Sequence, residues 1–181
     1  MYGRNYEGSE QLRVILIYRK KKEDSRKESE IMGFIDTLKE RAKANVKTIV
    51  LPETEDKRTL AATEKILKEG IAKVILVGNE EAVKKSAAED GYDISGAQIV
   101  DPATSEKTQG YIDKLVELRQ KKGMTPDQAK EILLNQYLYY GVMMVKMGDA
   151  DGMVSGACHS TADTLRPCLQ ILKTKPGTKL V

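Results

Sequence analysis

The sequence predicts an α/β fold, a three-layer α/β/α arrangement built around a mostly parallel sheet. Two observations carry this prediction. Short β-branched segments alternate along the chain with helical segments, and the links between them are only a few residues long. The expected strands are continuous apolar runs, not alternating patterns, which is typical of parallel strands covered by helices on both faces.

The first half of the chain shows this alternation clearly. Phe34, Ile35, Leu38 and Ala42 fall at helical spacing and predict a first helix. Strands are expected at Lys47–Leu51, Lys73–Val77 and Gln98–Val100, each closed by Pro, Gly or Asp-Pro. Between them we expect a helix over Leu60–Leu67 that ends at Gly70, and another that runs through Ala88.

Two longer helices are expected next. The first covers residues 105–122 and is broken by Gly123. The second opens with Thr125 as N-cap and Pro126 at the first helical position, and Gln128 completes a capping box. It is expected to continue to Met147 as a single helix. Its apolar stripe is rich in methionine, which favours a place in the core; the stripe comprises Ile132, Leu133, Gln136, Tyr140, Met143, Met144 and Met147.

The stretch Asp151–Pro167 organises the chemistry of the chain. Gly152–Val154 is short and apolar enough for a buried strand, a loop of small and hydroxylated residues follows, and helical spacing begins at Asp163. A strand, a Gly/Ser loop and a helix N-terminus together predict an anion site, since free N–H groups and the helix dipole favour negative charge. The plainer alternative is a turn whose Ser and Thr only cap the helix, and the pattern alone leaves both open.

The composition of the chain limits the classes of function that it can have. The chain has 181 residues, 40% of them apolar and 31% charged, with a net charge of +3. This small charge gives no indication of nucleic-acid binding, and no apolar run approaches membrane-spanning length. The only cysteines, Cys158 and Cys168, show no metal-ligand spacing and no disulfide framework, so we expect no metal site and a reducing cytoplasm.

Three stretches resemble the phosphate acetyltransferases: Asp151–Pro167, Leu51–Leu60 and Glu117–Arg119. The resemblance runs from Met32 to Val181 and covers about the first half of a family chain. It implies a two-domain α/β/α architecture with the site in the interdomain cleft, in a homodimer. On this basis we expect a first α/β domain over residues 32–149 and a truncated start of a second α/β domain over residues 150–181, which carries the site loop.

Residues 1–31 lie outside the resemblance. They contain the basic run Arg19–Lys22 and one short apolar stretch without a partner, and we expect them to be a disordered extension. Arg26-Lys27-Glu28 admits almost purely purine codons shortly before Met32. Our hypothesis is therefore a ribosome-binding site there, with Met32 as the natural start, which would be excluded by a native N-terminus at Met1.

The reaction that the resemblance implies is acetyl-CoA plus phosphate giving acetyl phosphate plus coenzyme A, by direct transfer in a ternary complex. Coenzyme A is then a substrate, and no cofactor is expected. Arg119 matches a family residue implicated in holding coenzyme A. The family's proton-transferring carboxylate lies beyond Val181, so no catalytic residue is assigned. The expected substrate-binding residues are Ser155, Gly156, Ala157, His159, Ser160, Thr161, Thr164, Arg166 and Arg119.

Two other groups of residues invite a catalytic interpretation. Cys158, His159 and Asp163 could form a nucleophile, base and orienting acid. Neighbouring side chains usually diverge, however, so a small buried cysteine beside a loop histidine is the preferred interpretation. The acidic residues after the first strand, Glu53, Glu55 and Asp56, are expected to form a solvated loop that starts a helix, with paired carboxylates facing the cleft as the alternative.

Two alternative functions remain at this point. The close relatives that transfer butyryl groups share the loop chemistry, and a non-catalytic phosphate- or nucleotide-binding α/β domain would also fit. A coenzyme A thiol-exchange assay separates turnover from mere binding. Because the matching residues supply anion-binding groups but no base for the thiol, we expect the 181-residue chain alone to show no acetyltransferase activity.

Overall fold

The computed structural model describes residues 33–174 and Gly177. The chain divides into two compact units, Met1–Ala44 and Asn45–Val181. In the first, a helix covers residues 33–44. The extension predicted for residues 1–31 lies outside the described residues.

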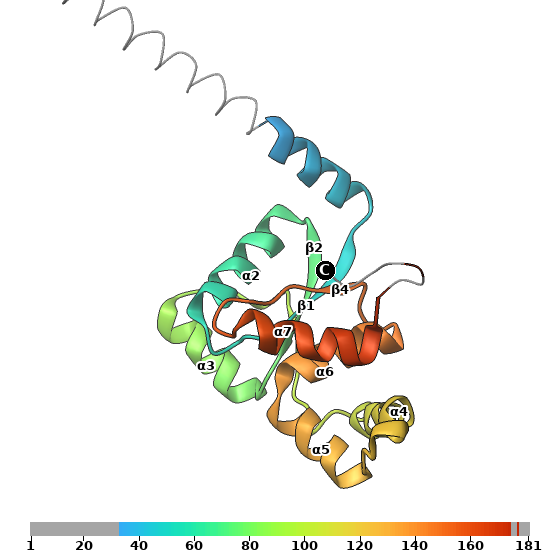
Figure 1. Ribbon diagram of the computed structural model, residues 1–181. Coiled ribbons are helices and arrows are strands. Elements are labelled where there is room, and N and C mark those ends of the chain that lie inside the picture. Colours follow the sequence, from blue (N-terminus) through green and yellow to red (C-terminus); the bar gives the residue numbers. More distant parts are fainter. Residues whose placement is uncertain (1–32, 175–176, 178–181) are drawn as a thin grey trace, which may run out of the picture. The chain divides into compact units, whose positions relative to one another are not determined.

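The second unit is built on a four-stranded sheet, and every pairing in it is parallel. Its strands are β1 (Lys47–Leu51), β2 (Ala72–Val77), β3 (Gln98–Val100) and β4 (Gly152–Met153), in the spatial order β3-β2-β1-β4 (Figure 1). Val50 of β1 is in register with Ile75 on one side and Met153 on the other. The predicted parallel sheet is confirmed.

Helices cover both faces of this sheet. On one face α2 (Lys57–Glu69) and α3 (Glu80–Asp90) pack on Leu51, Val74 and Leu76. On the other face α4 (Thr108–Arg119), α5 (Pro126–Asn135) and α6 (Tyr137–Met147) enclose Val50, Ile75 and Val77. Successive strand residues point to opposite faces, so both faces of β1 and β2 are buried. The three-layer α/β/α prediction is confirmed.

Several helix ends follow the local signals that predicted them. The Asp56 side chain accepts the backbone N–H of Arg58 and starts α2, and Gly70 ends it with φ of +66°. Thr125 and Gln128 form the expected capping box at the start of α5. The helix predicted before Gly123 is present as α4 followed by a short 3₁₀ turn, Gln120–Lys122.

The prediction of a single helix from Thr125 to Met147 is wrong. The chain breaks at Gln136, whose φ of −126° and ψ of 89° are not helical, and α5 and α6 are separate. Turning there lets α5 pack on α4 while α6 lies against the sheet. Gly141 permits this close approach, because a Cβ there would meet Met153 Sδ at 2.8 Å. Most of the stripe is core, but Met147 is exposed.

The predicted boundary between residues 149 and 150 does not divide the described chain. Strand β4 pairs with β1 in the first sheet, and the segments that follow it, α7 (Thr161–Pro167) and the π-helical turn η2 (Cys168–Leu172), pack on α6. Ile171 is fully buried in the same core. Leu169 and Leu172 of η2 nevertheless stay exposed, at 42% and 38%, so α6 and β1 cover this segment only in part.

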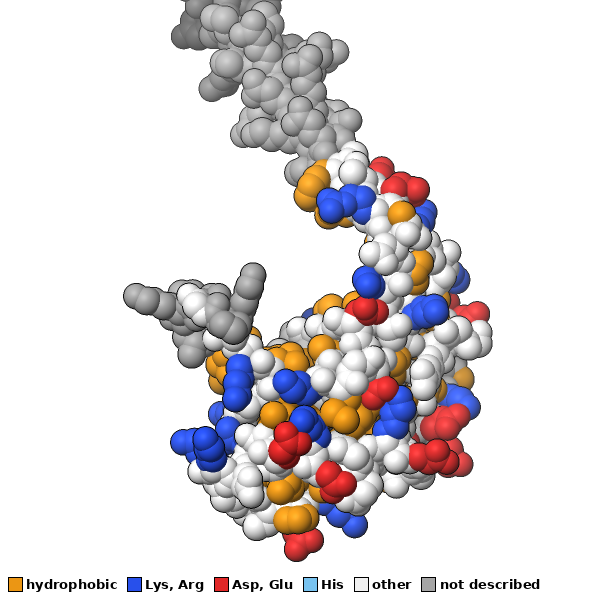
Figure 2. All heavy atoms as spheres, turned by 90° about the vertical axis from the view of Figure 1, so that its right-hand side faces the viewer, with side chains coloured by type: hydrophobic (Ala, Val, Ile, Leu, Met, Phe, Trp, Pro, Cys, Tyr) orange, Lys and Arg blue, Asp and Glu red, His pale blue; other side chains and the backbone are white. Residues whose placement is uncertain are grey.

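The surface of this unit mixes charges. On the face drawn in Figure 2, Lys and Arg side chains and Asp and Glu side chains occur together, with apolar side chains between them. Val154 and Leu165 are among the large apolar side chains that stay exposed. Within the described ranges, every helix is too short or too polar to cross a membrane.

Candidate functional site

The loop after β1 places a carboxylate inside the protein. Pro52 ends the strand, and the next residue, Glu53, is only 2% exposed. Its two carboxylate oxygens accept hydrogen bonds from four successive backbone N–H groups after β4: Gly156 at 2.6 Å, Ala157 at 2.8 Å, Cys158 at 3.1 Å and His159 at 3.0 Å. His159 Nδ1 lies 2.9 Å from the same carboxylate. The prediction of a solvated acidic loop is therefore wrong for Glu53.

These contacts keep Glu53 ionised. Burial by itself raises the pKa of the carboxyl group, but the N–H donors of Ala157, Cys158 and Gly156 and the His159 ring outweigh it and hold the pKa far below its usual range. Hydrogen bonds from several N–H groups stabilise the negative charge of a buried carboxylate. Glu53 therefore joins β1 to the loop that follows β4.

The same loop is held from a second side. Arg58 donates to the carbonyl of Ala157 and forms an ion pair with Asp56 at 2.6 Å. Ser160 is the N-cap of α7: its hydroxyl accepts the N–H of Asp163 at 3.2 Å and donates to the Asp163 carboxylate at 2.6 Å. Ser160 thus caps α7, its role in substrate binding stays a prediction, and Arg58 supports the loop.

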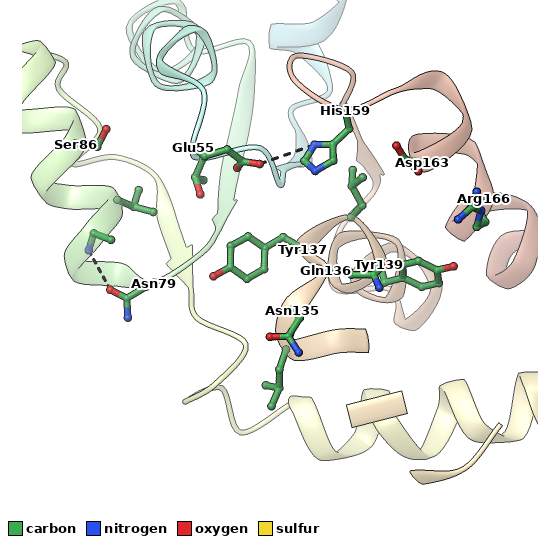
Figure 3. Close-up of a pocket in the computed structure, with 15 residues that line it drawn as sticks. Glu55, Asn79, Ser86, Asn135, Gln136, Tyr137, Tyr139, His159, Asp163 and Arg166 are labelled. Atoms are coloured by element: carbon green, nitrogen blue, oxygen red, sulfur yellow. Dashed lines mark hydrogen bonds and ion pairs between the residues drawn. The ribbon is translucent and has the colours of Figure 1, made fainter. Parts of the chain in front are cut away.

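A cavity of about 690 Å³ opens beside this loop (Figure 3). It lies where β1 and β2 end, the edge at which open α/β sheets place their ligands. Thr54 connects the two strand ends by donating to the carbonyl of Val77 at 3.0 Å. The polar and ionisable side chains of the wall are those of Thr54, Glu55, Asn79, Ser86, Asn135, Gln136, Tyr137, Tyr139, His159, Asp163 and Arg166.

Two arginines act at the Tyr139 end of this wall. Burial raises the pKa of the Tyr139 hydroxyl, while the positive charges of Arg166 and Arg119 lower it. The Tyr139 hydroxyl itself donates to Gln170 at 3.1 Å. Arg119 Nε is buried and has no hydrogen-bond partner among the residues that the structure describes. An anion between these cations would be attracted by both.

The structure distributes the predicted substrate-binding residues over several roles. His159 and Arg166 line the cavity, whereas the rest of the predicted set is absent from its wall. The N–H groups of Gly156 and Ala157, expected to face phosphate, donate to Glu53. Ser155 Oγ and Thr164 Oγ1 are buried, and within residues 33–174 neither has a hydrogen-bond partner. Their role in substrate binding stays a prediction, and so does that of Thr161 and Arg119.

The side chains of Cys158 and His159 were expected to diverge, and this expectation is wrong. The two side chains converge, with Sγ 3.5 Å from Nδ1, and Cys158 is exposed, not buried. The thiol is nevertheless a poor nucleophile. Desolvation of the sulfur, together with the hydrogen bond and charge of Glu55 and the charge of Glu53, raises the pKa of Cys158 to about 12. A thiolate is disfavoured next to two carboxylates.

Alkylation should report this raised pKa. In a Cys168→Ser variant, where Cys158 is the remaining thiol, the rate of reaction with iodoacetamide is expected to keep rising with pH beyond 10, because the thiolate forms only near pH 12. A small free thiol with a pKa of about 8.5 should instead level off near pH 9–10. A plateau for Cys158 in that lower range would contradict the structure.

Glu53, Cys158 and His159 also bring a carboxylate oxygen, a sulfur and a ring nitrogen within 4.8 Å of one another. Metal ligands need free lone pairs. Here each Glu53 oxygen already accepts hydrogen bonds from two backbone N–H groups. Glu53 Oε1 is also paired with His159 Nδ1, the ring nitrogen of the cluster. The cluster is therefore a hydrogen-bonded junction, and the sequence prediction of no metal site stays a prediction.

Sequence reasoning did not assign several residues of this region to the site. Glu53, which is not part of the cavity wall, was expected to be solvated, although its place just after a buried strand was a usable signal, because ligands bind at that edge of the sheet. Asn79 shares that position after β2, and its side chain caps α3 and donates to Asp101 at 2.9 Å. Tyr137 and Tyr139 carried no signal, because they were assigned to a continuous helix that in fact breaks beside them.

Comparisons with known proteins identify the family of the chain. A family model described as phosphate acetyl/butaryl transferase matches residues 33–181. The chain is 56% identical over 150 residues to a phosphate acetyltransferase of Acetivibrio thermocellus, covering 83% of this chain and 44% of that protein. It is 51% identical to one of Thermoanaerobacterium thermosaccharolyticum, with 83% and 45% covered. The chain thus spans about half the length of the curated relatives that it matches.

Two solved structures share the fold. The EutD phosphotransacetylase from Staphylococcus aureus superimposes with a TM-score of 0.75 at 42% identity, over 82% of this chain and 44% of that one. A phosphotransacetylase from Streptococcus pyogenes gives a TM-score of 0.77 at 39% identity, over 83% and 45%.

Proposed function

Because the chain belongs to the phosphate acetyl/butaryl transferase family, we propose that it takes part in transfer of an acetyl group between coenzyme A and inorganic phosphate. The proposed reaction is acetyl-CoA plus phosphate giving acetyl phosphate plus coenzyme A, and its reverse. The observation that supports it is the placement of Arg166 and His159 on one wall of a large cavity at the carboxyl ends of β1 and β2.

Arg166 is the main phosphate-binding residue in this proposal. Its guanidinium group offers paired N–H donors that match two phosphate oxygens, and it belongs to the last turn of α7, next to the cavity. His159 meets the same anion from the loop. The charge of Arg166 also acts on the Asp163 carboxylate, whose pKa is lowered chiefly by its hydrogen bond from Ser160. Arg119 supplies a second cation for the phosphates of coenzyme A.

Transfer is direct in this scheme. In the direction of acetyl-CoA synthesis, the sulfur of coenzyme A forms a bond to the acetyl carbonyl carbon, the bond from that carbon to the phosphate oxygen breaks, and phosphate leaves. The raised pKa of Cys158 argues against an acyl-cysteine intermediate. The base that accepts the thiol proton is assigned to none of the described residues. We further propose a cytoplasmic homodimer acting in acetate metabolism.

A chimera tests the proposal. Residues 33–181 replace the matching segment of the Acetivibrio thermocellus relative, and release of coenzyme A from acetyl-CoA is followed in the presence of phosphate. We expect turnover, with acetyl-CoA used better than butyryl-CoA. A preference for butyryl-CoA would favour the butyryl-transferring alternative. A folded chimera that binds phosphate and coenzyme A without turnover would instead favour a non-catalytic binding domain.

A further inference from the structure

The proposed transfer leaves one group without a role, the carboxylate of Glu53. It is buried and ionised, and it lies under the loop that carries His159. Its Oε2 accepts from Gly156 and Ala157, and its Oε1 accepts from Cys158 and His159. These contacts join residues 103–106 positions apart in the chain.

Glu53 determines the shape of the loop. Four successive N–H groups that converge on one point form a concave anion site, and without an anion their dipoles repel one another. Gly156 supports the bend with φ of +112°, a conformation that a residue with a Cβ rarely adopts. The carboxylate of Glu53 is the anion that this loop encloses. A substrate phosphate must therefore bind elsewhere, at the side chains that the loop presents.

Glu53 also determines which nitrogen of His159 is available. An ionised carboxylate accepts hydrogen bonds and donates none. Glu53 Oε1 lies 2.9 Å from Nδ1, so the hydrogen of this bond must sit on Nδ1. Nε2 is then the ring nitrogen left for a ligand. His159 belongs to the wall of the cavity, and Figure 3 shows its ring at the cavity edge between Glu55 and Asp163.

We propose that Glu53 is the positioning residue of this site: it holds the loop 156–159 as an internal anion and fixes the Nδ1–H form of His159, so that Nε2 accepts a hydrogen bond from a protonated oxygen of the substrate phosphate. The role of Nε2 rests on the proposed function, whereas the fixed ring does not. Glu53 itself touches no substrate and acts through His159.

Glu55 provides a matched control. It is the neighbouring carboxylate on the same loop, it also lies near the ring, and it is half exposed at 53%. Its oxygen is 3.9 Å from Nδ1, which is too long for a hydrogen bond. Removing its charge should therefore leave the ring as it is. A nonspecific effect of carboxylates near His159 would instead appear in both variants.

The experiment uses the full 181-residue chain, in which His159 is the only histidine. Nitrogen-15 NMR that correlates both ring nitrogens with the ring protons reports directly which nitrogen carries hydrogen. We expect hydrogen on Nδ1 in the wild-type chain and in Glu55→Gln, and a mixture of both forms in Glu53→Gln. A wild-type ring with hydrogen on Nε2 alone, or a Glu53→Gln ring unchanged from wild type, would overturn the proposal.

Titration with inorganic phosphate separates this inference from the proposed function. We expect phosphate to shift the Nε2 signal of the wild-type chain. Glu53→Gln should weaken the binding of phosphate about tenfold, because the His159 ring no longer holds the position in which it forms a hydrogen bond to the charged phosphate. His159→Asn keeps an N–H near the place of Nδ1 but lacks Nε2, so it should retain the loop and still lose phosphate affinity. Full affinity in His159→Asn would contradict a role for Nε2.

Different results would contradict the proposed function and the positioning role of Glu53. If phosphate shifts no signal of the wild-type chain while His159 keeps hydrogen on Nδ1, the proposed function and the role of Nε2 fail, and the positioning of the ring by Glu53 stands. If phosphate binds but Glu53→Gln changes neither the ring nor the affinity, the positioning role fails. A lower melting temperature in Glu53→Gln by itself would show only that the loop is stabilised, which is why the ring signal decides.

Discussion

Arg166→Ala is expected to weaken binding of inorganic phosphate to the chain by about tenfold to a hundredfold. A paired, charged hydrogen bond contributes about 1.5–3 kcal/mol, and alanine removes both donors. Arg166 lines the cavity at the end of α7, so the substitution removes a cation from the wall without opening the core. Calorimetric titration of wild type and variant at matched ionic strength measures the change.

Two further variants sharpen this test. Arg166→Lys keeps the charge but loses the planar pair of donors, so it should recover only part of the affinity. Arg41→Ala removes the same charge from the exposed face of the helix over residues 33–44 and should leave phosphate binding unchanged. Wild-type affinity in Arg166→Ala, with an unchanged melting temperature, would show that Arg166 does not bind phosphate.

Leu133→Ala is expected to lower the free energy of unfolding by about 2–5 kcal/mol. Leu133 lies on α5, is fully buried, and packs in the core between the sheet and the helices that include α4 and α6. Alanine loses the transfer free energy of the missing methyl groups and leaves a cavity among close-packed neighbours. Urea unfolding followed by circular dichroism measures the difference through the transition midpoint and its slope.

Leu165→Ala is the control for this prediction. Leu165 is 49% exposed on α7, so the same chemical change should cost less than about 1 kcal/mol. Equal losses in the two variants would indicate that α7 is covered in solution by something outside the described chain. A loss below about 1 kcal/mol for Leu133→Ala would show that the packing of α5 on the core is wrong.

The sequence predicted one part of the site, and the tertiary structure decided the other. Arg166 and His159 were predicted as site residues because their loop resembles that of the phosphate acetyltransferases, and a strand, a Gly/Ser loop and a helix start are compatible with an anion site. The structure places both on the cavity wall. The backbone N–H groups of that loop were expected to serve the same anion, yet they donate to Glu53. No local pattern distinguishes a loop that binds a ligand from one that binds a distant carboxylate of the same chain.

The sequence by itself determined what depends on neighbours in the chain. Strand β1, the Thr125–Gln128 capping box, the glycine end of α2 and the cap at Ser160 all arise from contacts within a few residues, and periodicity assigned the buried faces. Only the tertiary structure decided the break at Gln136, the pairing of β4 with β1, and the partner of Glu53. Each of these features depends on packing or hydrogen bonds between segments that are far apart along the chain. Such contacts stabilise the protein only after the sheet has assembled and brought the segments together.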